Sequence, residues 1–424
     1  MKITQKFKNK SLRLRQILFV VIALTALKSH GQILSNYITE AQKNSPKIEA
    51  MRLQYKVSEE KVNQADALPD TKFGAGYFLS TPETRVGPQQ FKVSAMQQLP
   101  WFGTLTAREN YAESLTETQY QKLAIAKRQL SLNLSQSFYK LYAFQAKIKV
   151  VNQNIELLKT YRELALSDVA NDRASSVDVM RLRIRQNDLV EKREILTQNF
   201  QAEAGNFNQF LNREIQQTPI LPDTLILPNK QNVKVENLKL HPELLQYEKM
   251  YDEVEKSEAV NQKESAPGFG VGLNYIQVQE RPQAVSDNGK DILMPVVSLS
   301  IPIFNNRYSS ISKEHELQQK RIEAEKENRL QELKSMTNTA FQNQGSARTT
   351  IEIQNKNIKQ AKDAISILNR QYETGELDYE EILDVQELQL KIQLKKADAV
   401  QYFFEQYALL NYLSPNELWQ KQFI

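Results

Sequence analysis

The sequence predicts a mainly α-helical fold with a small β part, built from one structural unit that occurs twice. The duplication is visible in four landmarks that recur in the same order about two hundred residues apart. The paired landmarks are Pro46 and Pro242, Phe73–Tyr77 and Phe269–Leu273, Leu99–Phe102 and Ile301–Phe304, and Ser175–Val179 and Asp378–Ile382. Each unit is expected to contain a medium helix, two strands joined by a loop, a very long helix and a second medium helix. A repeat of this size decides the fold, because it fixes which elements are equivalent.

The first 31 residues have the composition of a secretion signal. An apolar stretch, Ile17–Leu27, follows a basic segment that contains Lys2, Lys6, Lys8, Lys10, Arg13 and Arg15. The stretch is too short for a transmembrane helix, which needs about 20 apolar residues. We therefore expect residues 1–31 to be a signal peptide that is cleaved near Gly31. A short N-terminal anchor is the alternative.

Composition excludes several classes of protein. The full chain has a formal net charge of +5, but residues 1–31 hold seven of its 55 basic residues and none of its 50 acidic ones. The remaining chain is thus close to neutral and offers no basic surface typical of nucleic-acid binding. The sequence contains no cysteine, which excludes disulfides, thiolate metal sites and a lipid-modified N-terminal cysteine. No apolar run after Leu27 could form a membrane-spanning helix, so any membrane insertion must use β-strands.

Two very long helices are expected, from about Thr104 to Val169 and from about Ser309 to Tyr372, because neither range contains proline. At about 1.5 Å per residue, each would be roughly 100 Å long. Apolar residues in the first helix follow heptad spacing, which is typical of a coiled-coil seam. They form two columns, Leu134, Leu141, Ile148 and Ile155, and Leu130, Phe144, Val151 and Leu158.

A short break follows each long helix, at Asn171–Ser175 and at Thr374–Asp378. Gly375 can adopt the left-handed conformation that ends a helix, and Ser175 and Asp378 are typical N-caps for the helices that return. The shorter helices are expected at about Ser176–Phe210 and Tyr379–Tyr412 after the breaks, and at Leu34–Ala67 and Glu236–Glu264 at the start of each unit. This order gives a first repeat over residues 32–215, a proline-rich linker over 216–235, a second repeat over 236–415 and a C-terminal tail over 416–424.

Four runs of about ten residues alternate apolar side chains with polar or small ones, as half-buried strands do. They cover residues 71–80, 90–100, 268–279 and 291–301. Strands that cross an outer membrane need about 9–11 residues and show the same alternation; two hairpins of a soluble sheet are the alternative. Four strands cannot enclose a lumen, since even a packed barrel needs about eight. If these strands insert, several chains must share one barrel, with the polar loops Thr81–Gln89 and Glu280–Lys290 outside the cell.

The duplicated unit, the two strand hairpins, the long helices and their breaks resemble the TolC family of outer-membrane efflux proteins, over about Leu34 to Pro415. The resemblance implies a homotrimer with a β-barrel of twelve transmembrane strands, continued by an α-helical barrel that extends into the periplasm. It implies a passive channel in the cell outer membrane, surrounded by outer-membrane lipid, within a tripartite efflux or secretion system. The partners would be a periplasmic adaptor and an inner-membrane pump. The corner Pro100–Gly103 is similar to the branch that serves heavy-metal pumps of the resistance-nodulation-division class.

The resemblance also implies site residues. Tyr372, Gly375, Glu381 and Asp384 match a family pattern in which a tyrosine and a glycine precede two acids, with Glu381 in place of an aspartate. Glu381 and Asp384 would then constrict the pore and Tyr372 would stabilise the gate; the alternative is that both acids are ordinary solvated residues. The TolC branch has an arginine where this chain has Leu377. Contacts of the hairpin tips with the adaptor are expected at Asp172, Arg173, Gly375 and Leu377.

No enzymatic activity, cofactor or metal site is expected. After the signal segment only His241 and His315 remain, and neither has a second histidine or an aspartate pair at metal-ligand spacing. The sequence contains neither a Gly-rich phosphate loop nor a Gly-x-Ser-x-Gly elbow. The remaining alternative function is a periplasmic coiled-coil adaptor or a structural spacer. An adaptor should have one helical hairpin flanked by Gly-rich β-domains, whereas this chain has two hairpins and short strands.

Overall fold

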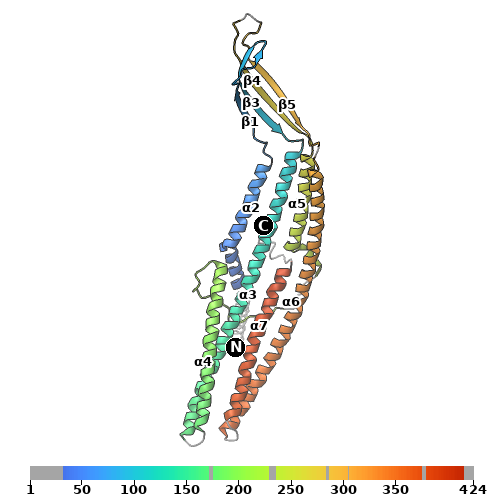
Figure 1. Cartoon of the computed structure of the whole chain (residues 1–424). Helices are drawn as coiled ribbons and strands as arrows, with labels where there is room; N and C mark the ends of the chain where they lie inside the picture. The colour runs from blue at the N-terminus through green and yellow to red at the C-terminus, as the bar shows by residue number, and fades with distance from the viewer. Residues whose placement is uncertain are drawn as a thin grey trace, which may run out of the picture. The chain divides into compact units, whose positions relative to one another are not determined.

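The computed structural model describes residues 32–170, 175–228, 235–282, 286–303, 305–374 and 379–414. It is mainly helical with one small sheet (Figure 1), as the sequence predicts. The helices are residues 32–44, α2 (Pro46–Ala65), α3 (Thr104–Val169), α4 (Ser176–Leu211), the 3₁₀ helix η1 (Val235–Leu240), α5 (Pro242–Glu264), α6 (Arg307–Glu373) and α7 (Tyr379–Leu413). The strands are β1 (Lys72–Tyr77), β2 (Glu83–Thr84), β3 (Gly87–Leu99), β4 (Gly268–Val278) and β5 (Ile292–Ser300). The predicted signal segment and the tail over 416–424 lie outside the described residues.

The duplication is visible in the element lengths. α3 has 66 residues and α6 has 67, while α4 has 36 and α7 has 35. α2 and α5 both begin with proline, which suits the first helical position because its missing N–H would have no helical partner there. In the described part of the chain, none of the helices carries an apolar stretch that could traverse a lipid bilayer.

The chain forms two compact units, and neither coincides with a sequence repeat. Unit 1 combines residues up to Glu49 with Ile125–His241 and Gln331–Ile424, while unit 2 combines Ala50–Ala124 with Pro242–Leu330. Each unit therefore takes segments from both repeats. The long helices α3 and α6 contribute to both units.

The sheet belongs to unit 2 and is antiparallel throughout. Its order is β1-β3-β4-β5, with the two-residue β2 paired to the start of β3. β3 pairs with β4, so the two hairpins form one continuous sheet. β1 is shorter than the predicted run over 71–80, and the two-residue β2 resumes regular pairing with β3 from Glu83.

The strand register divides the sheet into two chemically different faces. Directly opposed residues share a face, as in the pairs Phe73–Ala95, Val93–Tyr275 and Tyr275–Leu293. Apart from Gln97 and Gln277, one face is apolar and consists of Phe73, Ala75, Tyr77, Phe91, Val93, Ala95, Leu99, Phe269, Val271, Leu273, Tyr275, Leu293, Pro295, Val297 and Leu299. The other face is mostly small or polar, with Lys72, Gly74, Gly76, Lys92, Ser94, Met96, Gln98, Gly270, Gly272, Asn274, Ser298 and Ser300, although Ile276, Ile292, Met294 and Val296 also lie there.

Five of the eight residues in the apolar columns of α3 are buried inside unit 1, and Leu130, Phe144 and Ile148 are partly buried. Leu134, Leu141 and Val151 have no exposed surface, and Ile155 and Leu158 are also buried. Val151 and Ile155 pack with Leu196 of α4 and with Leu390 and Leu394 of α7. The predicted heptad face is therefore the face on which α4 and α7 pack.

Candidate functional site at the helix hairpins

The candidate site lies in unit 1, where α3 ends and α4 begins and where α6 ends and α7 begins (Figure 1). Ser175 caps α4 as predicted: its side chain accepts a hydrogen bond from the backbone N–H of Val177, and Asp178 completes a capping box. Asp172, Arg173, Gly375 and Leu377, the predicted adaptor contacts, lie outside the described residues, as does Asp378.

An apolar cluster fixes the helices at this end. Leu158 and Ala165 of α3 pack with Leu182 of α4 and Leu383 of α7. All four are buried, and Leu182 has no exposed surface. The polar side chains nearby are therefore carried by helices whose positions are set by packing.

Tyr372, the predicted gate residue, links the ends of the two long helices. Its hydroxyl donates to Oδ2 of Asp168 on α3 over 2.6 Å. A hydrogen bond to a carboxylate at this distance is charge-assisted and stronger than one between neutral groups. The structure thus pairs Tyr372 with a residue 204 positions away.

Two further polar contacts join α3 to its neighbours. Nε2 of Gln386 on α7 donates to the hydroxyl oxygen of Tyr161 over 2.5 Å. Nη1 of Arg162 donates to Oε1 of Gln186 on α4 over 2.9 Å. Together with Tyr372, these contacts connect α3 to α4, α6 and α7.

The two predicted constriction acids have different surroundings. Asp384 accepts a hydrogen bond from Nη2 of Arg185 on α4 over 3.3 Å, although 67% of its side chain is exposed. Glu381 is also exposed, and it has no ion-pair partner among the described residues. Glu380 and Glu381 lie in the first turn of α7, where the helix dipole favours negative charge. Glu381 is therefore a solvent-exposed acid at the start of α7.

Sequence reasoning missed the arginines that face these acids. Arg181 and Arg185 lie one turn apart on α4. Their partners Glu380 and Asp384 lie one turn apart on α7. Nη1 of Arg181 donates a hydrogen bond to Oε1 of Glu380 over 3.2 Å. In the sequence, two arginines on α4 and two acids on α7 have the same four-residue spacing, and this match could have indicated that they pair.

A second polar cluster, also missed from the sequence, joins α5 and α6 in unit 2. Nδ1 of His315 lies 2.7 Å from Oε2 of Glu258, and its Nε2 lies 3.2 Å from Oγ of Ser257. Burial opposes ionisation of Glu258, but hydrogen bonds from Ser312 and His315 outweigh it and lower the pKa of the carboxyl. Although this order resembles a catalytic triad, Ser257 lies inside α5, where the backbone N–H groups are used by the helix and cannot form an oxyanion hole.

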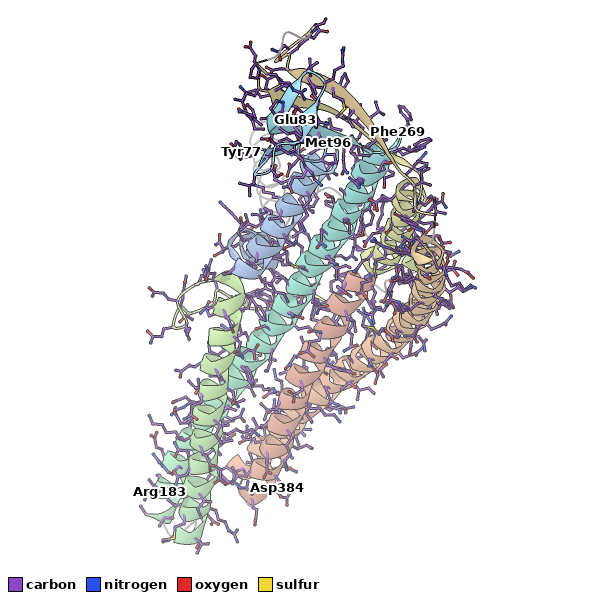
Figure 2. The ribbon with its side chains drawn as sticks, turned by 45° about the horizontal axis from the view of Figure 1, so that its top comes forward. Tyr77, Glu83, Met96, Arg183, Phe269 and Asp384 are labelled. Carbon is purple, nitrogen blue, oxygen red and sulfur yellow. The ribbon has the colours of Figure 1, made fainter. Side chains whose placement is uncertain are left out.

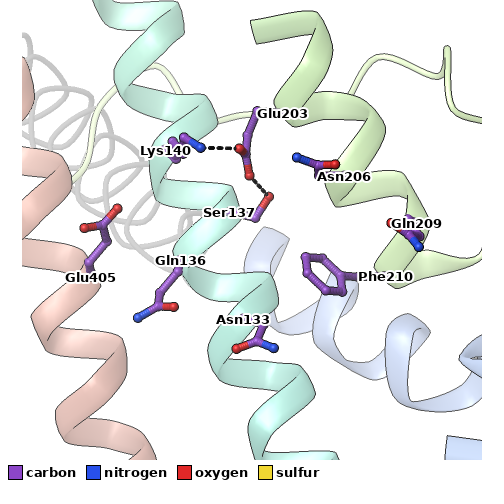
Figure 3. Close-up of a pocket in the computed structure, with 9 residues that line it drawn as sticks. All are labelled: Asn133, Gln136, Ser137, Lys140, Glu203, Asn206, Gln209, Phe210 and Glu405. Carbon is purple, nitrogen blue, oxygen red and sulfur yellow. Dashed lines mark hydrogen bonds and ion pairs between the residues drawn. The ribbon is translucent and has the colours of Figure 1, made fainter. Parts of the chain in front are cut away.

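A polar cleft in unit 1 has a volume of about 370 Å³ (Figure 3). Its centre is the buried Glu203 of α4. Oε2 of Glu203 forms an ion pair with Nζ of Lys140 at 2.6 Å, and its Oε1 accepts a hydrogen bond from Oγ of Ser137 over 2.6 Å. Burial raises the pKa of Glu405 across the cleft. In the described part of the chain, no group of three or more His, Cys, Asp or Glu residues is arranged to hold a metal ion. The cleft is thus organised around an internal ion pair.

The structure is similar to solved structures of outer-membrane proteins and transmembrane channels. The structure matches VceC from Vibrio cholerae with a TM-score of 0.72 and 14% identity, over 90% of this chain and 95% of that one. It matches CmeC from Campylobacter jejuni with a TM-score of 0.73 and 11% identity, over 90% and 85% of the two chains. The match to CusC has a TM-score of 0.73 and 13% identity, over 91% and 92%.

The chain has the fold of the TolC-family outer-membrane channels. No protein-family model matches its sequence, and neither does any curated protein. The resemblance that the sequence predicts is thus confirmed at the level of the fold, although the identities are only 11–14%.

Proposed function

We propose that this protein is an outer-membrane channel of a tripartite efflux or secretion system. Its TolC-family fold supports this function, and the two-faced sheet is the observation that carries it. An apolar face that runs across all four long strands is what lipid-exposed strands require, and a face of small and polar residues is what a water-filled lumen requires. Large side chains on the apolar face are exposed, with 78% of Phe73 and 77% of Val297 accessible.

The proposed assembly is a homotrimer. Within the described residues, β1 and β5 are the outer strands of the sheet, and each therefore has an edge with unpaired backbone groups. Such edges are not tolerated in lipid, where every N–H and C=O must be paired. Pairing of β5 of one copy with β1 of the next would close the 12-stranded barrel, and the helices would continue it into the periplasm.

The channel would conduct substrates passively from an inner-membrane pump, of the resistance-nodulation-division class, through a periplasmic adaptor. The hairpin tips, with Asp172, Arg173, Gly375 and Leu377, would contact the adaptor. Glu381 and Asp384 would face the pore, and the hydrogen bond of Tyr372 to Asp168 would hold the closed state. An adaptor or spacer role has less support, because the solved structures of the same fold are channels.

Detergent extraction followed by bilayer recording tests this proposal. We expect the protein in the outer-membrane fraction, a trimer by mass measurement in detergent, and discrete ion channels in planar bilayers. A tag in the loop Glu280–Lys290 should be labelled on intact cells, while the same tag at Asn171–Ser175 should not. A monomer that is released without detergent and conducts no ions would refute the proposal.

A further inference from the structure

We infer that Arg185 neutralises Asp384 within each chain, so that Glu381 alone sets the charge of the constriction. The inference rests on the proposed function, because it takes Glu381 and Asp384 to face the pore. It concerns the selectivity of that pore. Two acids per chain in three chains would give six negative charges, whereas neutralisation of Asp384 leaves three.

The first support is a ladder of ion pairs between α4 and α7. Arg181 pairs with Glu380 and Arg185 with Asp384, and both pairs join residues 199 positions apart. Equal separation means that the two helices run parallel here and that the pairs are successive rungs, one helical turn apart. The two ion pairs therefore form a regular contact between α4 and α7 and are not one isolated surface ion pair.

The second support is the packing beneath the ladder. Leu182 follows Arg181 on α4, Leu383 precedes Asp384 on α7, and the two leucines belong to one buried cluster. Only 32% of the Arg185 side chain is exposed, so packing restricts its movement, and its contact with Asp384 is made through Nη2. Arg185 is thus anchored by its surroundings, and its charge remains beside Asp384 even though an exposed ion pair adds little stability.

The third support is the contrast with neighbouring charges. Arg183 lies on α4 between the two paired arginines, and it is exposed without an ion-pair partner among the described residues. Figure 2 shows Arg183 and Asp384 near the hairpin ends of α4 and α7. Glu381 is also exposed, and it lies between two acids that have partners, Glu380 and Asp384. Each chain therefore presents one uncompensated acid at the predicted constriction.

Block of single-channel current by Mg²⁺ tests the inference. Arg185→Gln should uncover Asp384 in all three chains and tighten the block by at least tenfold, since a single unit charge about 6 Å from a divalent cation in water already accounts for about tenfold. Arg183→Gln is the matched control, since it removes the same charge from the same helix without uncovering an acid, and it should leave the block within about twofold. Arg185→Lys should behave as the wild type.

The double variant Arg185→Gln with Asp384→Asn separates the two possibilities. If Arg185 neutralises Asp384, removal of both leaves the charge unchanged and restores the wild-type block. If Asp384 is an independent pore charge, Arg185→Gln alone has no effect and the double variant is blocked more weakly than the wild type. That second pattern, in channels that conduct and are trimeric by mass, overturns the inference and leaves the proposed function intact. Absence of any channel from the wild-type protein would overturn both.

Discussion

At the scale of single residues, the hairpin end is held by polar contacts between residues far apart in the sequence. Tyr372 binds Asp168, Gln386 binds Tyr161, and Arg185 binds Asp384. The sequence identifies Tyr372 and Asp384 through a short motif, but not their partners. A motif carries local spacing, whereas a partner on another helix depends on how the helices pack.

Tyr372→Phe tests the most specific of these contacts. The substitution keeps the ring but removes the hydroxyl that donates to Asp168. A hydrogen bond to a charged group contributes about 1.5 kcal/mol or more, so its loss should raise the open fraction of a closed channel about tenfold. Resting conductance in planar bilayers measures this change.

Tyr402→Phe is the control for Tyr372→Phe. Tyr402 lies on α7, is partly exposed, and has no hydrogen-bond partner within the described residues. Its substitution should leave the resting conductance unchanged. Equal conductance of both variants and the wild type would show that the contact between Tyr372 and Asp168 does not hold the channel closed.

At the scale of elements, the helices and the strand faces are predictable because their periods are local. Most residues of the heptad columns of α3 are buried, and the alternation along β1, β3, β4 and β5 assigns the two sheet faces. The pairing of β3 with β4, which joins the hairpins, was not derivable in this way. Strand pairing between distant segments depends on tertiary contacts that no local period encodes.

Leu182→Ala tests the packing of α4 on α3 and α7. Leu182 has no exposed surface, so removal of its side chain should leave a cavity and lower the free energy of unfolding by about 2–5 kcal/mol. Ile184→Ala, two residues along the same helix, removes a side chain that is 60% exposed and should change it by less than about 0.5 kcal/mol. Thermal unfolding in detergent compares the two. A similar loss in both variants would contradict the assignment of the buried face.

At the scale of the whole molecule, the sequence repeats and the compact units divide the chain differently. The repeat follows the order of the chain, while each compact unit collects segments from both repeats. Duplication placed equivalent strands in both halves, and the pairing of β3 with β4 brought them into one sheet. That sheet has an apolar face with no covering element within the described part of unit 2, since Phe73 and Val297 remain exposed. The apolar face of the sheet therefore needs a covering surface that the described part of unit 2 does not supply.

Val297→Arg tests whether lipid covers this apolar face. Val297 lies in the middle of β5, opposite Val271, and a buried arginine at the bilayer midplane costs about 2–4 kcal/mol. We expect the variant to be depleted from the outer membrane. Ser298→Arg is the matched variant, because Ser298 is the next residue of the same strand and lies on the opposite face, across from Gly270. Its arginine would project into a water-filled lumen, so this variant should assemble as a trimer and show altered conductance. Membrane fractionation and mass measurement in detergent distinguish the two, and normal assembly of Val297→Arg would argue that the apolar face packs against protein and not against lipid.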